Sequence, residues 1–393
     1  MLDAPRTTYS DPQPPGMASR AARMVRIAVI AIGVVLGLSI ACTTLHADDE
    51  ATLRGHVAAL ASDRFAERNA ATIALIEAGE AAVPLVGDAV QSGDREASYR
   101  GLLVLQRLLS GDDLAARRAA RKQLASLSQS DDRYVARLST ESLRVVFDEA
   151  VRQLQAARAG ITRDDSGRIQ AISFAHKDVD DEALAPLDDV APLELNLTNT
   201  RITDATLERL AVQTQLELLN LMATKVTDDG LKHVANLTAM HTFSVERTAV
   251  SDAGLAHLKN MKNLKTLYLG GSRVAGPGLA HVEQLPIEYL SFAYSPIDDA
   301  AVEQIVRIKS LKTLGLDDTK ITDACLPALA DLPNLEVLWL DNTAVTDAAI
   351  PHLKQLKKLK TLHFKNTRIS SDGRARLRRE LDEVQLIGSD ATR

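Results

Sequence analysis

The chain has 393 residues, of which 46% are hydrophobic, 25% charged and 3% aromatic, and its formal net charge at pH 7 is −6. This composition is ordinary for a globular protein, and the acidic excess excludes non-specific nucleic-acid binding, which requires a basic surface. The two cysteines, Cys42 and Cys325, lie in unrelated segments, so the sequence predicts no disulfide framework.

The first 47 residues predict a targeting segment ahead of the folded domains. Residues 1–16 are rich in proline and polar residues and show no periodicity, so we expect them to be disordered. Three arginines then precede the apolar run Ile27–Ala41, which is the arrangement of a secretory signal peptide. Cleavage after Ala47 fits the residues that follow this run.

Alternatives to cleavage remain open for this segment. Residues 27–45 approach the ~20 residues that cross a bilayer, so an uncleaved anchor fits as well as a cleaved signal. Lipidation at Cys42 fits less well, because Leu38 lies four residues before the cysteine and the lipoprotein pattern has leucine three before. Met17 or Met24 is an alternative start. Each interpretation exports the bulk of the protein, which is then periplasmic or anchored to the inner membrane.

Residues 48–160 predict an all-α domain, because their apolar residues recur at helical spacing. Phe65, Ala71 and Leu75 show this spacing in the first segment that carries a capping signal. Start signals predict helices beginning at Ser62-Asp63, Pro84, Asp94, Asp112 and Asp131. The runs DRFAERNAATIALIEAGEAAVPLV and DREASYRGLLVLQRLL resemble HEAT-like helical repeats, which usually present a surface to a protein partner. A plain helical bundle that caps the following domain is the alternative.

Residues 161–388 repeat one pattern, which Leu335–Asp347 gives most clearly as L-x-x-L-x-L-x-x-T-x-V-T-D. We call the first threonine of this pattern, or the serine in its place, the marker. The markers recur every 23 or 24 residues and are Thr200, Thr224, Thr248, Ser272, Ser295, Thr319, Thr343 and Thr367. A turn at Asp165-Ser166-Gly167 separates the two domains. A charged helix, Ser371–Glu383, and a partial strand, Val384–Ile387, close the array before a tail, 389–393.

This period and the L-x-x-L-x-L core are typical of leucine-rich repeats. The T-x-[IV]-T-D form resembles the subclass close to the cysteine-containing leucine-rich repeats. Within this resemblance, an exported bacterial protein matches the sequence better than a eukaryotic F-box protein does. The resemblance implies an α/β fold, a right-handed solenoid with parallel strands on its concave face, and protein binding without catalytic residues. Similar repeats occur in F-box adaptors for ubiquitination, but the sequence has no convincing F-box and its export signal disfavours that role.

Two columns of polar residues follow the repeat. We expect each repeated aspartate to cap its own helical segment, and these residues are Asp204, Asp228, Asp252, Asp323 and Asp347. Four histidines lie nine residues after their markers and are expected on the surface: His233, His257, His281 and His352. Helical segments pack about 8–10 Å apart, whereas metal ligands must converge at about 2 Å from one ion, so we predict no metal site.

Standard catalytic motifs are missing from the sequence, including G-x-S-x-G, H-E-x-x-H and G-x-x-x-x-G-K-[ST]. The sequence therefore predicts a protein that is not an enzyme and needs no cofactor.

The outward residues of the strands are free of the repeat consensus, and they become aromatic in the later repeats. Aromatic side chains on an exposed concave face are typical of binding hot spots. The predicted ligand-binding residues are Tyr268, Tyr289, Asp317, Trp339, Asp341 and His363. Gly315 has no side chain, and we expect it to leave a gap between Tyr289 and Trp339 that holds one inserted group.

These patterns favour a non-enzymatic scaffold or adaptor of the cell envelope that binds a protein partner on its concave face and binds no nucleic acid. A carbohydrate-binding envelope protein, in which Trp339 and the tyrosines stack on sugar rings, is the alternative.

Overall fold

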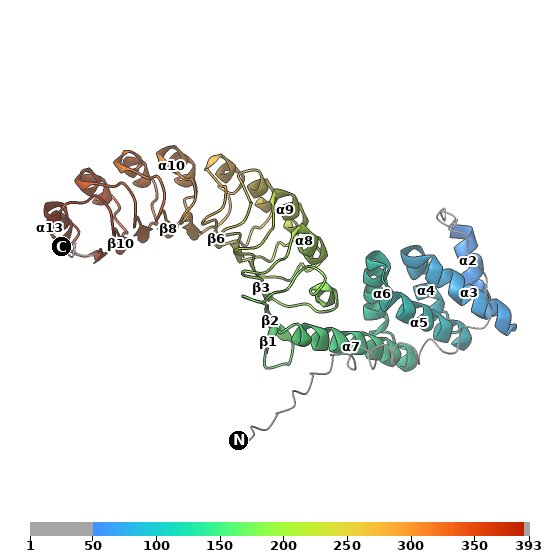
Figure 1. The fold of residues 1–393 in the computed structure, drawn as a ribbon. Helices are drawn as coiled ribbons and strands as arrows, with labels where there is room; N and C mark the ends of the chain where they lie inside the picture. Colours follow the sequence, from blue (N-terminus) through green and yellow to red (C-terminus); the bar gives the residue numbers. More distant parts are fainter. Residues whose placement is uncertain (1–49, 389–393) are drawn as a thin grey trace, which may run out of the picture.

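The computed structural model describes residues 50–388. Figure 1 shows a domain of packed helices that is joined by one long helix, α7, to a curved array of strands and short helices. The predicted signal or anchor at 27–45, the lipidation at Cys42 and the tail 389–393 lie outside the described residues. Within residues 50–388, no helix is both long enough and apolar enough to span a bilayer.

The helical domain begins at the first described residue. Its helices are α2 (Glu50–Ala59), α3 (Phe65–Glu77), α4 (Val83–Val90), α5 (Arg95–Leu109), α6 (Leu114–Leu127) and α7 (Arg133–Ala156), with a 3₁₀ turn, η1 (Gly79–Ala82), between α3 and α4. Their apolar faces enclose one core, which includes Leu75, Leu102, Leu105 and Leu109. The HEAT-like character of this domain stays a prediction.

Aspartates cap three of these helices. Asp94 caps α5 as predicted, and its carboxylate accepts a hydrogen bond from the backbone N–H of Ala97. Asp113 and Asp132 cap α6 and α7, each one residue later than predicted, because only there does the carboxylate reach the free N–H groups of the first turn.

The predicted start of α3 is wrong in its detail. Arg64 occupies the N-cap position, and the hydroxyl of Ser62 instead donates to the carboxylate of Glu67. Phe65 does not enter the core, because it starts the helix on its outer side and is 67% exposed. The guanidinium groups of Arg68 and Arg100 lie 5.9 and 5.7 Å from its ring centroid.

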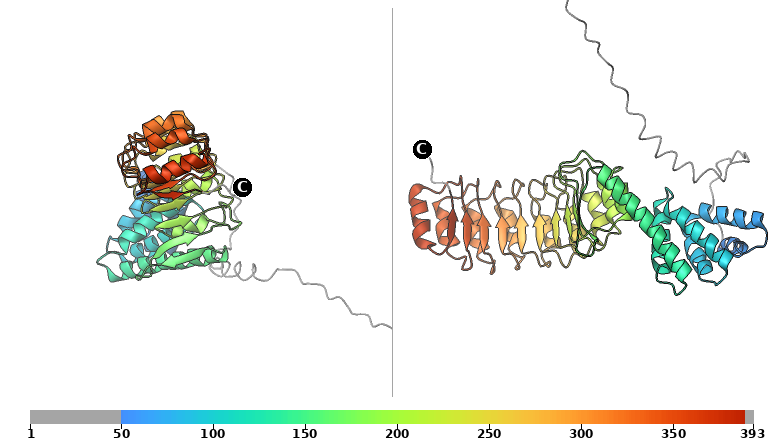
Figure 2. Two further views of the ribbon diagram at one scale, coloured as in Figure 1. Left: turned by 90° about the vertical axis from the view of Figure 1, so that its left-hand side faces the viewer. Right: turned by 90° about the horizontal axis from the view of Figure 1, so that it is seen from below.

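The second domain is a right-handed leucine-rich repeat solenoid, which confirms the predicted fold class. Its strands form one sheet in sequence order, and the strands run side by side along the inner face of the arc (Figure 2). They are β1 (Gly160–Arg163), β2 (Ile169–Ser173), β3 (Glu194–Asn196), β4 (Leu218–Asn220), β5 (Thr242–Ser244), β6 (Thr266–Tyr268), β7 (Tyr289–Ser291), β8 (Thr313–Gly315), β9 (Val337–Trp339), β10 (Thr361–His363) and β11 (Gln385–Ile387).

Helical segments cover the outer side of the arc in Figure 1. They are η2 (Ala185–Asp189), α8 (Asp204–Leu210), α9 (Asp228–Val234), η3 (Gly254–Leu258), η4 (Pro277–His281), α10 (Asp299–Ile305), η5 (Asp323–Cys325), α11 (Leu326–Leu329), η6 (Asp347–Ala349), α12 (Ile350–Leu353) and α13 (Ser371–Glu380). Strands pack about 4.8 Å apart and helices about 8–10 Å apart, so the array curves with its sheet inside.

The middle residue of each central strand points into the core. Leu195, Leu219, Phe243, Leu267, Leu290, Leu314, Leu338 and Leu362 occupy this position. Each is fully buried, and strand pairing aligns them in one row. A single repeat cannot bury this face alone, so neighbouring repeats stabilise one another.

The structure adds a strand at the junction of the two domains. β1 pairs antiparallel with β2 across the predicted turn, whereas β2–β11 pair in parallel. The carboxylate of Asp164 accepts hydrogen bonds from the backbone N–H groups of Ser166 and Arg168 and closes this turn. The sequence predicted only a turn here. β1 lies outside the repeat period, and it covers the edge of β2.

Each repeated aspartate bonds to the following repeat, so the prediction that it caps its own helical segment is wrong. In most repeats a hydroxyl residue, such as Thr203 or Thr346, caps the segment. The aspartate one repeat earlier accepts hydrogen bonds of 2.5–2.9 Å from the backbone N–H and the hydroxyl of that residue. These pairs, which we call the aspartate ladder, are Asp181–Thr203, Asp204–Thr227, Asp228–Ser251, Asp299–Thr322, Asp323–Thr346 and Asp347–Ser370.

Two adjacent repeats depart from the aspartate ladder. Asp252 bonds to the backbone N–H groups of Ala275, Gly276 and Gly278, because Ala275 has no hydroxyl group. Gly276 then replaces the next aspartate, and Asp298 caps α10 with its own side chain.

The aspartate ladder predicts coupled stability between repeats. Asp323→Ala leaves the Thr346 N–H without its acceptor and should lower the free energy of unfolding by about 1–3 kcal/mol, measured by urea denaturation. Asp331→Ala, an exposed change in the same repeat, should stay within about 0.5 kcal/mol of wild type. In a double-mutant cycle, Asp323→Ala and Thr346→Val should be non-additive; additive losses would contradict a contact between repeats.

Candidate binding surface on the concave face

Two rows of side chains project from the concave face, because side chains alternate along each strand. The central row lies four residues before each marker and contains Asn196, Asn220, Ser244, Tyr268, Ser291, Gly315, Trp339 and His363. The flanking row lies six residues before each marker and contains Glu194, Leu218, Thr242, Thr266, Tyr289, Thr313, Val337 and Thr361. Strand pairing sets each residue beside its equivalent on the next strand.

The two predicted tyrosines form one contact. Tyr268 of the central row and Tyr289 of the flanking row lie on adjacent strands, with their ring centroids 4.9 Å apart and the rings tilted by 48°. Burial, with smaller contributions from the neighbouring Tyr268 and Glu246, raises the pKa of Tyr289 to about 12. Both phenols therefore remain protonated at neutral pH and can donate hydrogen bonds.

Trp339 and His363 form a second aromatic pair. Their rings are stacked, with centroids 4.3 Å apart and an interplanar angle of 23°. Trp339 is partly buried, and its Nε1–H group is enclosed without a hydrogen-bond partner among the described residues. A buried N–H group without a partner is uncommon in folded proteins.

Small residues separate the two aromatic pairs. In the central row, Ser291 and Gly315 lie between Tyr268 and Trp339, three strands apart or about 14 Å at the usual strand spacing. A Cβ atom on Gly315 would lie 3.1 Å from the Ser291 hydroxyl, so a larger residue would narrow this gap. Tyr289 lies on the strand before Gly315, as expected. It pairs with Thr313 in the flanking row and contacts the ring of Tyr268, so Tyr268 is the aromatic residue on that side of the gap in the central row.

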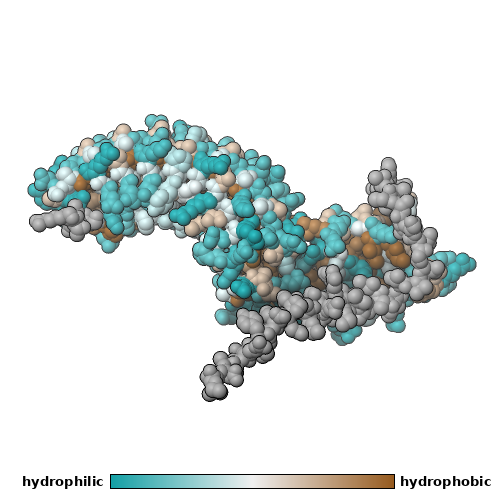
Figure 3. All heavy atoms as spheres, in the orientation of Figure 1, coloured by the Kyte–Doolittle hydropathy of each residue, from teal (hydrophilic) through white to brown (hydrophobic). Residues whose placement is uncertain are grey.

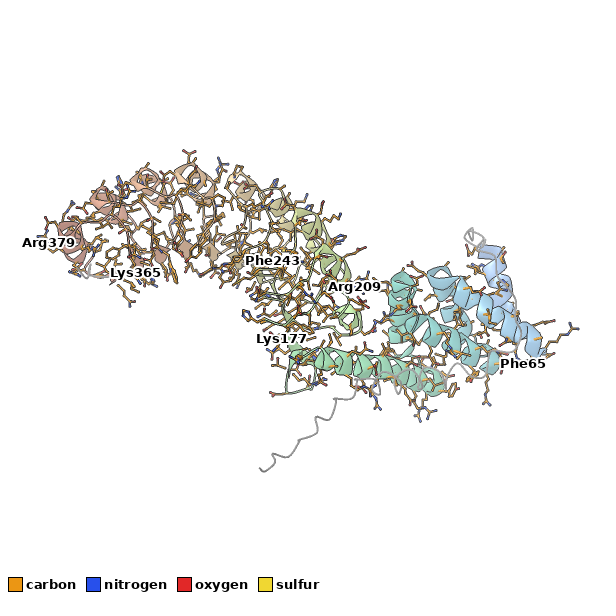
Figure 4. All side chains as sticks on the ribbon, in the orientation of Figure 1. Phe65, Lys177, Arg209, Phe243, Lys365 and Arg379 are labelled. Carbon is orange, nitrogen blue, oxygen red and sulfur yellow. The ribbon has the colours of Figure 1, made fainter. Side chains whose placement is uncertain are left out.

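Carboxylates line one side of the aromatic pairs. Glu246, Asp317 and Asp341 each lie two residues before a marker, at the end of a strand. The carboxylate of Glu246 lies over Gly270, where a Cβ atom would be only 2.9 Å from its Oε1. Asp341 accepts a hydrogen bond from the backbone N–H of Lys365, which Figure 4 shows on the inner side of the arc.

Glu246 and Asp317 are carboxylates that lack a compensating ion pair among the described residues. Burial raises the pKa of Glu246, although the Ser244 hydroxyl and Arg247 partly oppose this effect. Burial also raises the pKa of Asp317. The nearby Asp318 and Asp341 carboxylates raise this pKa as well, whereas His363 lowers it. An uncompensated, partly buried carboxylate is destabilising and favours a cationic ligand.

Sequence reasoning did not select Glu246. The available signal was its position, since it lies at the same place in its repeat as Asp317 and Asp341. It was missed because Gly270 and Ala293 interrupt the row between Glu246 and Asp317, and only the folded sheet shows that the two carboxylates affect each other.

The predicted histidine column and the metal prediction concern residues away from the concave surface. Among residues 50–388, no group of three or more histidine, cysteine, aspartate or glutamate side chains is arranged to hold a metal ion. The four predicted histidines are His233 and His352, in the convex helices, and His257 and His281, in the convex 3₁₀ segments. In the view of Figure 3, the largest hydrophobic area lies over the helical domain rather than on the solenoid.

No protein-family model and no curated protein matches the chain. Among solved structures, internalin C2 of Listeria monocytogenes is 26% identical, with a TM-score of 0.41, over 50% of this chain and 80% of that one. Internalin F of the same bacterium is 17% identical, with a TM-score of 0.35, over 63% and 90%. The plant peptide hormone receptor RGFR1 in complex with RGF2 is 15% identical, with a TM-score of 0.37, over 59% and 40%.

The raised pKa values predict that these carboxylates reduce stability at neutral pH. A raised carboxyl pKa means that the folded protein binds more protons than the unfolded chain, so stability falls as pH rises from the unfolded pKa through the folded pKa. The variant Glu246→Gln/Asp317→Asn should therefore raise Tm at pH 7 by on the order of 2 °C. The difference should disappear near about pH 3, where the carboxyls are protonated in both states.

Glu288→Gln is the matched control, because its carboxylate behaves in the opposite way. A hydrogen bond from Lys312 lowers the pKa of Glu288, so removing this charge should leave Tm at pH 7 unchanged or slightly lower. A lower Tm for the Glu246/Asp317 variant at pH 7 would show that these two carboxylates are stabilised within the chain.

Proposed function

We propose that the protein is a non-enzymatic scaffold that binds a protein partner on the concave face of its solenoid. The observation that carries this proposal is the surface from Glu246 to His363. Two aromatic pairs flank Ser291 and Gly315 there, and the carboxylates of Glu246 and Asp317, which have no ion pair among the described residues, lie beside them. Aromatic anchors beside a gap are typical of binding hot spots, whereas the solenoid core does not require them.

The partner presents a basic side chain to this surface. A lysine or arginine inserted over Ser291 and Gly315 lies between the aromatic pairs, whose faces attract a cation. The same group lies beside the carboxylate of Asp317, whose Oδ1 would be 3.4 Å from a Cβ atom on Gly315, and offsets the unfavourable burial of its charge; the positive charge also favours the ionised form of Glu246. A neutral sugar stacked on Trp339 would leave this charge uncompensated, so the proposal favours a protein over a carbohydrate ligand.

The scaffold acts outside the cytoplasm. This part of the proposal rests on residues 20–50, in which arginines precede an apolar run and the acidic residues Asp48–Glu50 follow it. A scaffold exported in this way meets partners of the cell envelope.

The export proposal predicts protease sensitivity in intact bacterial spheroplasts. Protease added from outside should digest the solenoid as completely as it digests a known periplasmic protein, because export places residues 48–388 outside the inner membrane. Lysis of the spheroplasts should not increase digestion. Protection that is lost only on lysis would refute export without affecting the proposed concave surface.

The binding proposal predicts a large effect of Trp339→Ala. Crosslinking and pull-down from envelope fractions identifies the partner, and a titration then measures Kd for wild type and variant. Trp339→Ala should weaken binding by ~2 kcal/mol or more, because the gap loses one wall, with little change in Tm. Glu246→Gln/Asp317→Asn should weaken the same complex.

Two changes outside the surface serve as controls. Glu194→Ala alters a distant strand of the same face, and Tyr99→Ala removes an exposed aromatic residue of the helical domain. Both should bind normally. Normal binding by Trp339→Ala would contradict the proposal, and so would its unfolding, which would show that the indole is structural. Recognition of a glycan array in place of a protein would favour the carbohydrate alternative.

A further inference from the structure

A second candidate site lies where the two domains meet. A cavity of about 770 Å³ is lined by α6, α7, the β1–β2 hairpin, the end of η2 and the segment that follows α8. We call it the junction trough. Its volume is in the range of small-molecule sites, which occur preferentially at domain interfaces. The surface from Glu246 to His363 contributes none of its lining residues.

Ion pairs hold the domains together at one edge of the junction trough. Arg117 of α6 lies 2.6 Å from the carboxylate of Asp189, and Arg121 also bonds to this carboxylate. Arg209 of α8, which Figure 4 shows on the side facing the helical domain, lies 2.7 Å from the buried carboxylate of Asp188. These contacts already engage both aspartates of the trough.

Three further cations line the junction trough, and two of them, Lys122 and Arg163, have no ion pair among the described residues. The third, Arg118, forms only a long ion pair of 3.9 Å with Asp188 and donates to the carbonyl of Arg209, and its Nε is enclosed without a hydrogen-bond partner. Lys122 is exposed and has no ion pair. Arg163 donates to the carbonyl of Gly167 and lies over the Phe147 ring, 5.7 Å from its centroid. This excess of positive charge occurs in a chain of net charge −6.

The floor of the junction trough is apolar. Phe147 is partly buried, Ile169 and Val190 are buried, and Val212 is 49% exposed. Val212, which is exposed beside Lys122 and Arg163, contributes little to the packing of either domain. Cations at the rim and apolar groups at the floor are complementary to a molecule that carries both an acidic group and an apolar body.

We propose that the junction trough binds an amphiphilic organic anion. Its acidic group lies between Arg118, Lys122 and Arg163, and its apolar body covers Phe147 and Val212. An inorganic anion would leave the apolar floor uncovered, and a neutral apolar molecule would leave the cations unpaired. Because both domains line the trough, the ligand also bridges them and should raise the Tm of the full chain.

Two fluorescent probes with one aromatic body test this proposal. 8-Anilino-1-naphthalenesulfonate carries an acidic group, and N-phenyl-1-naphthylamine lacks it. Titration of the full chain should show tighter binding of the sulfonate. Lys122→Glu should weaken sulfonate binding by about fivefold, and Val212→Asp by about tenfold or more, since it places a like charge on the floor. Each variant must first melt like wild type, because the sulfonate probe also binds loosely packed protein.

Lys232→Glu, a charge reversal on the exposed side of α9, is the matched control and should bind the sulfonate probe normally. Trp339→Ala should also bind it normally, so this proposal and the concave-surface proposal can fail independently. Equal affinity for the two probes, or normal sulfonate binding by both Lys122→Glu and Val212→Asp, would overturn the proposal.

Displacement experiments identify the source of the natural anion. Displacement of the sulfonate probe by monomeric decanoate supports a free amphiphile. Displacement by phosphatidylglycerol vesicles, but neither by decanoate nor by phosphatidylcholine vesicles, supports an anionic lipid at a membrane surface. Displacement by none of them would overturn the assignment of an amphiphilic anion.

Discussion

The alignment of equivalent residues in successive repeats is the constraint on which the solenoid depends. Three-residue strands pair in register at separations of 23 or 24 residues, and this register brings one apolar side chain of each strand into a continuous core. The same register places each ladder aspartate beside the hydroxyl residue of the next repeat. Curvature follows, because strands pack more closely than helices.

This register also separates the carboxylates of the aspartate ladder from those of the concave face. The aspartates of the ladder each accept at least two hydrogen bonds from the neighbouring repeat, so their burial is compensated within the chain. Glu246 and Asp317 lie on the concave face, where burial raises their pKa values without an ion pair to oppose it. Carboxylates thus stabilise the fold at the helix starts and destabilise it on the concave face, where a bound cation would compensate their buried charge.

The two domains are connected by one helix that belongs to both cores. Val135 of α7 packs within the helical domain, and Val151 and Leu154 pack within the solenoid. Between these ends the interface is closed by Arg117 and Arg121 on Asp189 rather than by apolar packing. Lys122 and Arg163 line the resulting trough without an ion pair among the described residues, whereas Glu246 and Asp317 lack one on the concave face, so the two proposed sites suit ligands of opposite charge.

The sequence by itself determined the repeat period, the core leucines and the rows of outward residues, because these depend on patterns within one repeat. It therefore predicted the leucine-rich repeat solenoid and placed Trp339 and His363 on adjacent strands. Only the tertiary structure decided that the ring of Tyr289 contacts that of Tyr268 and that the charge of Asp317 acts on Glu246. It also decided that each ladder aspartate bonds to the next repeat. These contacts join residues from different repeats. The aspartate contact follows the repeat period, but only the folded chain shows that the side chain reaches the next repeat rather than its own helix start; the other two contacts depend on side-chain conformations that follow no period.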